Sequence, residues 1–423
     1  MRIKMRRRDA ALLLGLLALG LPGCKKREPA ANKELSVGSS AATPSGAPRT
    51  PGVTNDKIKI GSWGPLSGPA AQWSAVLHGM NAYFSFINDQ GGVHGRKIEF
   101  VFRDDQYSPS KTPGIVRELV EKEEVFALIG GIGTANGRAV ADYLEEKDVP
   151  FFTPASGDRF WSDPGKKNVY TVFPRYVTEG EILGRYAATE LKAKKVGVLF
   201  QDDDFGKQGL EGVKKGVAAA GGQVVVEVSC QPVDTDLGGQ VSQIVQGKPD
   251  ALIVFAAPKQ AVTAVKMLDA QNKKPKIVTS FVLSDPILFK LAGKAWEGTI
   301  ASTAGALPAG ESEAAKQYRE ILQKYGAGKL PVGNFTLAGF QFAIPFVEAM
   351  HRAGRDLSRP KVYEALQSLK DWSGPALYWK SADLGPKITF SPTKRLGNDK
   401  VYLIVAKDGK WEKLTDWLSA DAN

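Results

Sequence analysis

Short apolar strands alternate with helical segments, and this alternation constrains the fold more than any other feature of the chain. The strands lack alternating polar residues, as expected when both faces of a parallel sheet are covered. The first half of the chain is therefore predicted to be α/β. Its predicted strands are Ile58–Ser62, Lys97–Phe102, Val125–Ile129 and Pro150–Thr153, and its predicted helices are Ala71–Asp89, Pro109–Glu123 and Ala135–Lys147.

A second series of the same kind follows an extended segment around Phe173-Pro174-Arg175. Two such series predict a two-lobed α/β protein in which each lobe is a parallel sheet flanked by helices. Ligands of such sheets bind beyond the carboxyl ends of the strands, so we expect a cleft between the lobes. The predicted strands are Val196–Phe200, Gln223–Val228, Ala251–Phe255 and Lys276–Ser280, and the helices are Glu179–Lys192, Phe205–Ala220, Leu237–Gln246 and Lys259–Gln271.

The last part of the chain is predicted to be helical and then to form short strands. The helices, Glu311–Tyr325, Phe335–Ala353 and Arg359–Leu369, are apolar enough to pack on the first lobe. Strands are predicted at Ile388–Phe390 and Val401–Val405, with a hairpin at Lys407–Lys410. We expect lobe 1 to comprise residues 55–174 and 304–372 and lobe 2 to comprise 175–303 and 373–418. The chain would then cross a hinge three times.

The N-terminus has the pattern of a bacterial lipoprotein signal. A basic start precedes an apolar run, Ala10–Leu21, that is too short to span a bilayer comfortably. Leu21-Pro22-Gly23-Cys24 resembles a lipobox, which predicts a signal peptide at 1–23 and lipidation of Cys24; the alternative is a plain secretory signal with a chance cysteine. Residues 24–54 are poor in large apolar residues and predict a flexible tether. The protein is expected to be a periplasmic or cell-surface lipoprotein that meets the membrane only through its lipid anchor.

Charge and motifs exclude several classes of function. The 56 Lys and Arg outnumber the 45 Asp and Glu, but without the signal, which holds five basic residues and one acidic residue, the excess is 51 minus 44, or +7. This excess forms no basic stripe, so nucleic-acid binding is not expected. Gly131, Gly133 and Gly137 miss the dinucleotide-binding spacing, and no cofactor, metal site or catalytic constellation is predicted.

The stretch Gly61–Trp73 is predicted to be a strand-to-helix turn that lets a ligand approach the backbone, although an ordinary loop with a buried tryptophan fits as well. With other segments, in order and spacing, it resembles the branched-chain-amino-acid-binding proteins, which have the type I periplasmic-binding-protein fold and serve ABC importers. The resemblance covers roughly Lys57 to Leu414. The segments are Gly64–Pro69, Asn88–Lys97, Arg103–Asp105, Gly130–Thr134, Val149–Ser156 and Gln201–Gly209.

The resemblance implies a site for a ligand carboxylate. Thr134, with Gly133 beside it, matches a hydroxyl residue of the glycine-rich loop, although Thr134 could instead cap the helix that follows. Ala155 would offer its backbone and Ser156 its hydroxyl, and Trp73 would line the mouth of the cleft. The family has a further threonine two residues after this alanine, but this chain has Gly157 there, so the resemblance does not supply that contact. Hydroxyl groups and amides that converge at strand ends suit a carboxylate, because hydrogen bonds to a charged acceptor are strong.

The second lobe departs from the amino-acid pattern. Where the family places a glutamate for the ligand ammonium, this chain reads Thr279-Ser280-Phe281-Val282-Leu283, and the family's tyrosine falls in Ala256-Ala257-Pro258. A buried ammonium without a counter-charge is costly. We therefore expect an aromatic or short-chain carboxylate, with Phe205 and Phe281 as apolar walls. In the alternative interpretation, an acid from a neighbouring loop replaces the glutamate: Asp202, Asp203, Asp204 or Asp285.

Taken together, these patterns predict a solute-binding receptor of an ABC importer and not an enzyme. It would be a monomer that binds a small carboxylate, an amino acid or another acid, first through lobe 1, closes lobe 2 over it and delivers it to permease subunits. A ligand-sensing adaptor of the same fold, which signals through a membrane partner, is the alternative.

Overall fold

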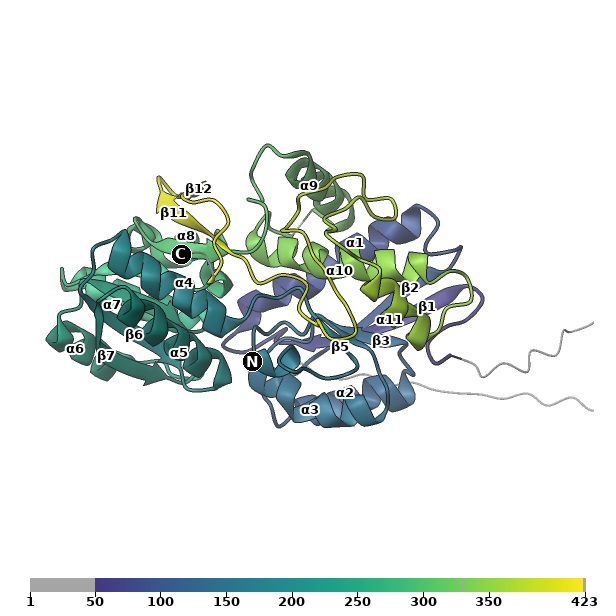
Figure 1. The fold of residues 1–423 in the computed structure, drawn as a ribbon, viewed down its shortest axis with the longest axis horizontal. Coiled ribbons are helices and arrows are strands. Elements are labelled where there is room, and N and C mark those ends of the chain that lie inside the picture. Colours follow the sequence, from purple (N-terminus) through teal and green to yellow (C-terminus); the bar gives the residue numbers. More distant parts are fainter. Residues whose placement is uncertain (1–49, 329, 421–423) are drawn as a thin grey trace, which may run out of the picture. The chain divides into compact units, whose positions relative to one another are not determined.

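The computed structural model describes residues 50–328 and 330–420, and it contains two sheets (Figure 1). The predicted signal peptide, Cys24 and most of the predicted tether lie outside the described residues. The first sheet has the order β2-β1-β3-β4-β5, and all of its pairs are parallel. Its strands are β1 (Lys57–Gly64), β2 (Lys97–Asp104), β3 (Ala127–Ile129), β4 (Phe151–Phe152) and β5 (Val169–Tyr170).

The second sheet has the order β7-β6-β8-β9-β10-β11-β12. It is parallel from β7 to β10, whereas β11 and β12 form an antiparallel hairpin at its edge. Its strands are β6 (Lys195–Gln201), β7 (Gln223–Cys230), β8 (Ala251–Phe255), β9 (Lys276–Thr279), β10 (Ile300–Thr303), β11 (Tyr402–Lys407) and β12 (Lys410–Lys413). The predicted two-lobed α/β fold is confirmed.

The order of the helices shows how the chain passes between the sheets. Helices α1 to α3 belong to the first series and α4 to α8 to the second, after which α9 and α10 return to pack on α1 before β11 joins the second sheet. The chain therefore passes between the two sheets three times, as predicted. The helices are α1 (Ala75–Asp89), α2 (Thr112–Arg117), α3 (Thr134–Glu146), α4 (Tyr176–Thr189), α5 (Asp204–Ala219), α6 (Gly238–Gly247), α7 (Pro258–Ala270), α8 (Ile287–Ala292), α9 (Glu313–Tyr325), α10 (Asn334–Arg352) and α11 (Arg359–Gln367).

Some local predictions were wrong. The predicted strand Ile58–Ser62 extends through Trp63 and Gly64, which were predicted as turn, so that Trp63 is fully buried and the turn starts at Pro65. The predicted strand Ile388–Phe390 does not form; Ile388 makes only an isolated bridge with Trp372. The sequence analysis missed β5, β10 and α8. Two-residue strands such as β5 are too short to show a period, and β10 consists mostly of small residues.

Residues between α11 and β11 pack without regular structure against the first sheet's helices. Trp379, Leu384, Ile388 and Phe390 are buried in the same apolar cluster as residues of α1 and α10. The described chain also begins in packed structure, since Val53 pairs with Ile58. The boundaries of the two lobes stay a prediction.

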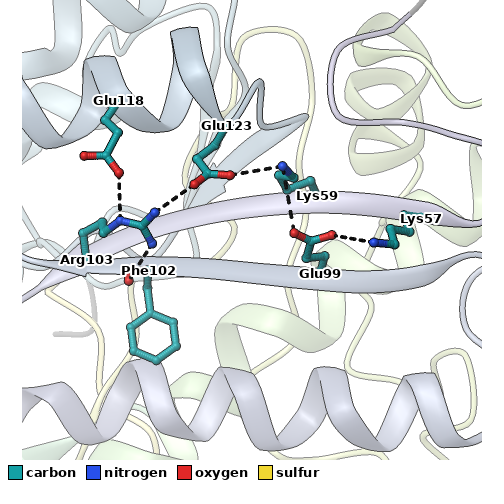
Figure 2. A network of polar contacts seen from close by, with 7 residues as sticks. All are labelled: Lys57, Lys59, Glu99, Phe102, Arg103, Glu118 and Glu123. Atoms are coloured by element: carbon teal, nitrogen blue, oxygen red, sulfur yellow. Dashed lines mark hydrogen bonds and ion pairs between the residues drawn. The ribbon is translucent and has the colours of Figure 1, made fainter. Parts of the chain in front are cut away.

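A polar network lies on one face of the first sheet (Figure 2). Arg103 of β2 donates to Glu118 at 3.0 Å and to Glu123 at 2.8 Å, and Lys59 of β1 lies 3.1 Å from Glu123. These side chains are 27–39% exposed, so each pair contributes little to stability.

None of the helices among the described residues is both long and apolar enough to cross a bilayer.

Candidate functional site

The start of α3 forms the floor of the candidate site. Gly133 has φ +111°, and a Cβ there would lie 2.4 Å from Asn136 Oδ1, so the turn requires glycine. Thr134 is the first helical residue, and its Oγ1 lies 2.8 Å from Ser156 Oγ. The alternative that Thr134 caps the helix is wrong, because Gly133 occupies that position and the helix has no side-chain cap. The Thr134 hydroxyl therefore lies at the N-terminal end of α3.

A buried carboxylate holds this floor in place. Asp105 accepts hydrogen bonds from Thr112 Oγ1 and Asn136 Nδ2, each at 2.8 Å, and from the backbone N–H of Tyr107 at 2.9 Å. Burial raises the pKa of Asp105, although these hydrogen bonds oppose the shift. The network ties the loop after β2 to the first turn of α3 and fixes the position of Tyr107.

Two tyrosines that sequence reasoning missed bring hydroxyl groups to the site. Tyr176 makes a side-chain hydrogen bond with Thr134, and Tyr107 accepts one from Gln201 Nε2 at 3.3 Å. Burial raises the pKa of both tyrosines, so both hydroxyls stay protonated at neutral pH and can donate. Both follow the end of a strand of the first sheet, which is the only sequence signal that could have found them.

Aromatic rings form the opposite wall. Tyr176 lies 4.7 Å from Phe205 and 6.1 Å from Phe281, and Phe281 lies 4.9 Å from Phe173, all between ring centroids. Trp73 packs against Tyr107 at 5.3 Å, and its indole N–H donates to the Val282 carbonyl oxygen at 3.3 Å. The first-series residue Trp73 therefore contacts a loop of the second sheet at the rim.

These groups surround a cavity of about 160 Å³. Six of the seven residues predicted for the site line it: Trp73, Gly133, Thr134, Ala155, Phe205 and Phe281. Ser156 does not line the cavity, because it lies behind Thr134 and its oxygen accepts from the backbone N–H of Asp158 at 3.3 Å. The Ala155 amide, which the resemblance would offer to a ligand, donates to the Gly131 carbonyl oxygen at 3.0 Å.

The lining contains no charged side chain among the described residues. The four acids considered as substitutes for the missing glutamate are all engaged elsewhere. Asp202 pairs with Lys207 at 2.8 Å and Asp204 lies 3.4 Å from Arg138. Asp203 accepts from Gln201 Nε2 at 2.6 Å, and Asp285 accepts from the Phe335 amide, at the start of α10, at 2.8 Å. The alternative of a substitute acid in the cavity therefore finds no support in the described lining.

A different acid lies directly behind the apolar wall. Glu179 of α4 is fully buried and accepts hydrogen bonds from the Phe281 amide at 2.7 Å, from Ser280 Oγ at 2.9 Å and from Ser302 Oγ. Burial raises its pKa to about 8. Its oxygens are directed at the backbone that carries Phe281, so Glu179 positions the wall and does not line the cavity.

Contacts across the cleft hold the two halves together. Gln208 of α5 donates from Nε2 to Asp158 Oδ1 at 2.6 Å, and its Oε1 accepts from the Arg159 amide at 3.1 Å. Asp158 also accepts from Arg138 Nη2 at 3.1 Å. Farther out, Arg159 pairs with Glu211 at 2.8 Å. These contacts join α5 to the loop that follows β4.

Comparisons with known proteins agree with this architecture. A family model described as periplasmic binding protein matches residues 57–410. The leucine-, isoleucine-, valine-, threonine- and alanine-binding protein of Pseudomonas aeruginosa is 25% identical over 324 residues, which cover 74% of this chain and 83% of the relative.

Solved structures show the same fold. A fatty acid ABC transporter substrate-binding protein from Thermomonospora curvata is similar with a TM-score of 0.79 and 26% identity, over 89% of this chain and 96% of the other. A branched chain amino acid ABC transporter from Thermus thermophilus with bound valine has a TM-score of 0.78 and 21% identity, over 86% of this chain and 97% of the other. Proteins of this kind are binding proteins and not enzymes. With the match over residues 57–410, the chain belongs to the periplasmic binding protein family and is a solute-binding protein of the ABC-transporter type.

Proposed function

We propose that this chain is the lipid-anchored receptor of an ABC importer and that it binds an organic acid with an apolar body and no α-ammonium group. The observation that carries this proposal is the lining of the cavity, which is rich in aromatic and aliphatic side chains and lacks a charged one among the described residues. An ammonium group placed there would lose its hydration without gaining a counter-charge, which is costly. The anchor is inferred from the lipobox at Cys24.

The carboxylate would lie at the start of α3. The first-turn amides of a 13-residue helix, the Tyr107 hydroxyl and the hydrogen-bonded pair of Thr134 and Tyr176, which has one hydroxyl proton left, would supply donors there. An anion is favoured at a helix N-terminus because the unpaired amides point at it and the helix dipole adds to the attraction. The aromatic wall of Phe205 and Phe281 would then cover the apolar body.

The names of relatives leave the ligand open. The Pseudomonas aeruginosa protein is described as binding five amino acids, and the Thermomonospora curvata protein is described as a fatty acid transporter's binding protein. Their identities with this chain, 25% and 26%, are nearly equal, so similarity does not favour either ligand class. The uncharged lining favours an acid without an ammonium group.

A ligand screen tests this proposal. Thermal unfolding of the mature protein should shift upward with phenylacetate or hexanoate and stay unchanged with leucine or valine. A ligand at 100 times its Kd stabilises by about 2.7 kcal/mol, which is readily measured. The matched controls are phenylacetamide and hexanamide, which keep the body and remove the charge. Tight binding of leucine with no response to either acid would contradict the proposal, and equal binding of acids and amides would contradict the carboxylate site.

Closure over the ligand depends on the bridge made by Gln208. Gln208→Ala removes two hydrogen bonds that join α5 to the loop of Asp158 and Arg159. At about 1 kcal/mol each, this should weaken binding of the responding acid about 10- to 30-fold in isothermal titration, with little change in unfolding of the unliganded protein.

The control for the bridge is Glu211→Ala on the same helix. It removes the ion pair with Arg159, whose side chains are 47% and 50% exposed, so the loss should be about fivefold at most. Equal losses in the two variants would mean that the buried bridge has no special part in closure.

A further inference from the structure

Residues along one face of α10 line the cavity. Lining residues recur along this helix at the spacing of a single stripe: Asn334, Leu337, Ala338, Gln341, Phe342 and Pro345. Eleven helical steps at about 1.5 Å each give roughly 16 Å of lined helix. The stripe begins at Asn334, which donates to the Ser284 carbonyl oxygen at 2.5 Å, and it ends at Pro345. The cavity lining therefore extends beyond the floor at α3 and the aromatic wall to include this face of α10.

Beside Gln341 of the stripe, which contacts Leu384, the irregular segment that follows α11 forms an apolar compartment of the same cavity. Trp372, Trp379, Leu384 and Ile388 line this compartment, and three of them are at least 94% buried. Pro345 of α10 adds its ring to the same wall. We refer to these four residues with Pro345 as the tail compartment.

Two amide side chains in this region, those of Gln341 and Asn398, are already paired. Gln341 donates from Nε2 to the carbonyl oxygens of Ala304 and Leu384, each at 3.1 Å. Asn398 donates to the Lys400 carbonyl oxygen at 3.3 Å and accepts from the Lys400 amide at 3.1 Å. These groups have little capacity left for a polar ligand, so the tail compartment suits hydrocarbon.

From this geometry we propose that the ligand is a monocarboxylate with an extended alkyl chain, whose tail lies along α10 and ends in the tail compartment. The inference rests on the proposed function, because it takes the carboxylate at α3 as its starting point. Each methylene that the compartment removes from water adds to the affinity, so the compartment selects for chain length. Ala338, halfway along the stripe, leaves the space through which the chain passes.

A chain-length series tests the inference. Isothermal titration of the mature protein with butanoate, hexanoate, octanoate, decanoate and dodecanoate should show Kd falling by up to about fourfold per methylene until the compartment is filled. If butanoate and octanoate bound equally well, the tail compartment would be refuted while the carboxylate proposal stood. If none of these acids bound, the proposed function would fail and this inference with it.

Two substitutions locate the tail. Ala338→Phe should abolish the gain between hexanoate and decanoate, because the ring blocks the path along the stripe. Ser373→Phe, in the lining next to Trp372, should shorten the preferred chain without abolishing the gain, and it changes a part-exposed residue that folding tolerates more readily. An unchanged chain-length profile in a folded Ser373→Phe variant would overturn the assignment of the tail compartment.

Discussion

Replacing Glu179 by glutamine is expected to remove a fall in stability that the native protein undergoes between pH 4.5 and about 8. The folded protein holds the Glu179 proton up to about pH 8, whereas the unfolded chain releases it near pH 4.5. Between these values the folded state binds more protons than the unfolded state, so stability decreases as the pH rises. The stabilising effect of the proton is complete below pH 4.5 and is lost above pH 8.

The expected size of the effect follows from the shift in pKa, which separates 4.5 from about 8. At about 1.4 kcal/mol per unit, the fall amounts to on the order of 5 kcal/mol. Glutamine is neutral throughout this range, and it can accept from the Phe281 amide and Ser302 with its oxygen while donating to Ser280. In urea unfolding below pH 4.5 and above pH 8, the free energy of unfolding of the variant should increase relative to that of the native protein as the pH rises.

Glu190→Gln is the matched control for Glu179→Gln. Glu190 lies exposed at the C-terminal end of the same helix, so its loss should leave the pH dependence unchanged. Because Asp105, Asp203 and Asp285 also have raised pKa values, the informative quantity is the difference between native and variant profiles. Parallel profiles for Glu179→Gln and the native protein would show that Glu179 is ionised in the folded state at mildly acidic pH.

Glu179 also illustrates what the sequence could predict about the site. The family pattern placed an acid near Ser280 and Phe281, and an acid does lie there, but it comes from α4, about a hundred positions away, and serves the wall and not the cavity. Its side chain looked like an ordinary first-turn acid, since helix starts favour carboxylates. Only the packing of α4 on β9 and β10 brings the carboxylate to this position.

Elements with a clear apolar pattern were predictable and those without one were not. Most strands of both sheets are short apolar runs and most helices carry apolar periodicity, and the residues at strand ends, such as Thr134 and Phe281, could be assigned to a cleft. The tail compartment comes from a segment that has no period and reaches the cavity because it packs beside α1 and α10 after the chain has returned to the first sheet. Similarly, Tyr107 becomes a site residue through the buried Asp105 network.

Gly212→Ala is expected to destabilise the second lobe by about 2–3 kcal/mol, because helices α4 and α5 touch through their backbones. A Cβ on Gly212 would lie 2.1 Å from the Val177 carbonyl oxygen, and a Cβ on Gly180 would lie 2.3 Å from that of Gly209. In a helix without such a contact, alanine would stabilise relative to glycine by about 1 kcal/mol. The expected net destabilisation therefore means that the steric cost of the added methyl group exceeds this intrinsic advantage. Gly239→Ala in α6, where nothing lies within 4 Å, should instead stabilise by about 0.4–1 kcal/mol. Urea unfolding followed by circular dichroism distinguishes the two variants, and a neutral Gly212→Ala would show that α4 and α5 can separate without cost.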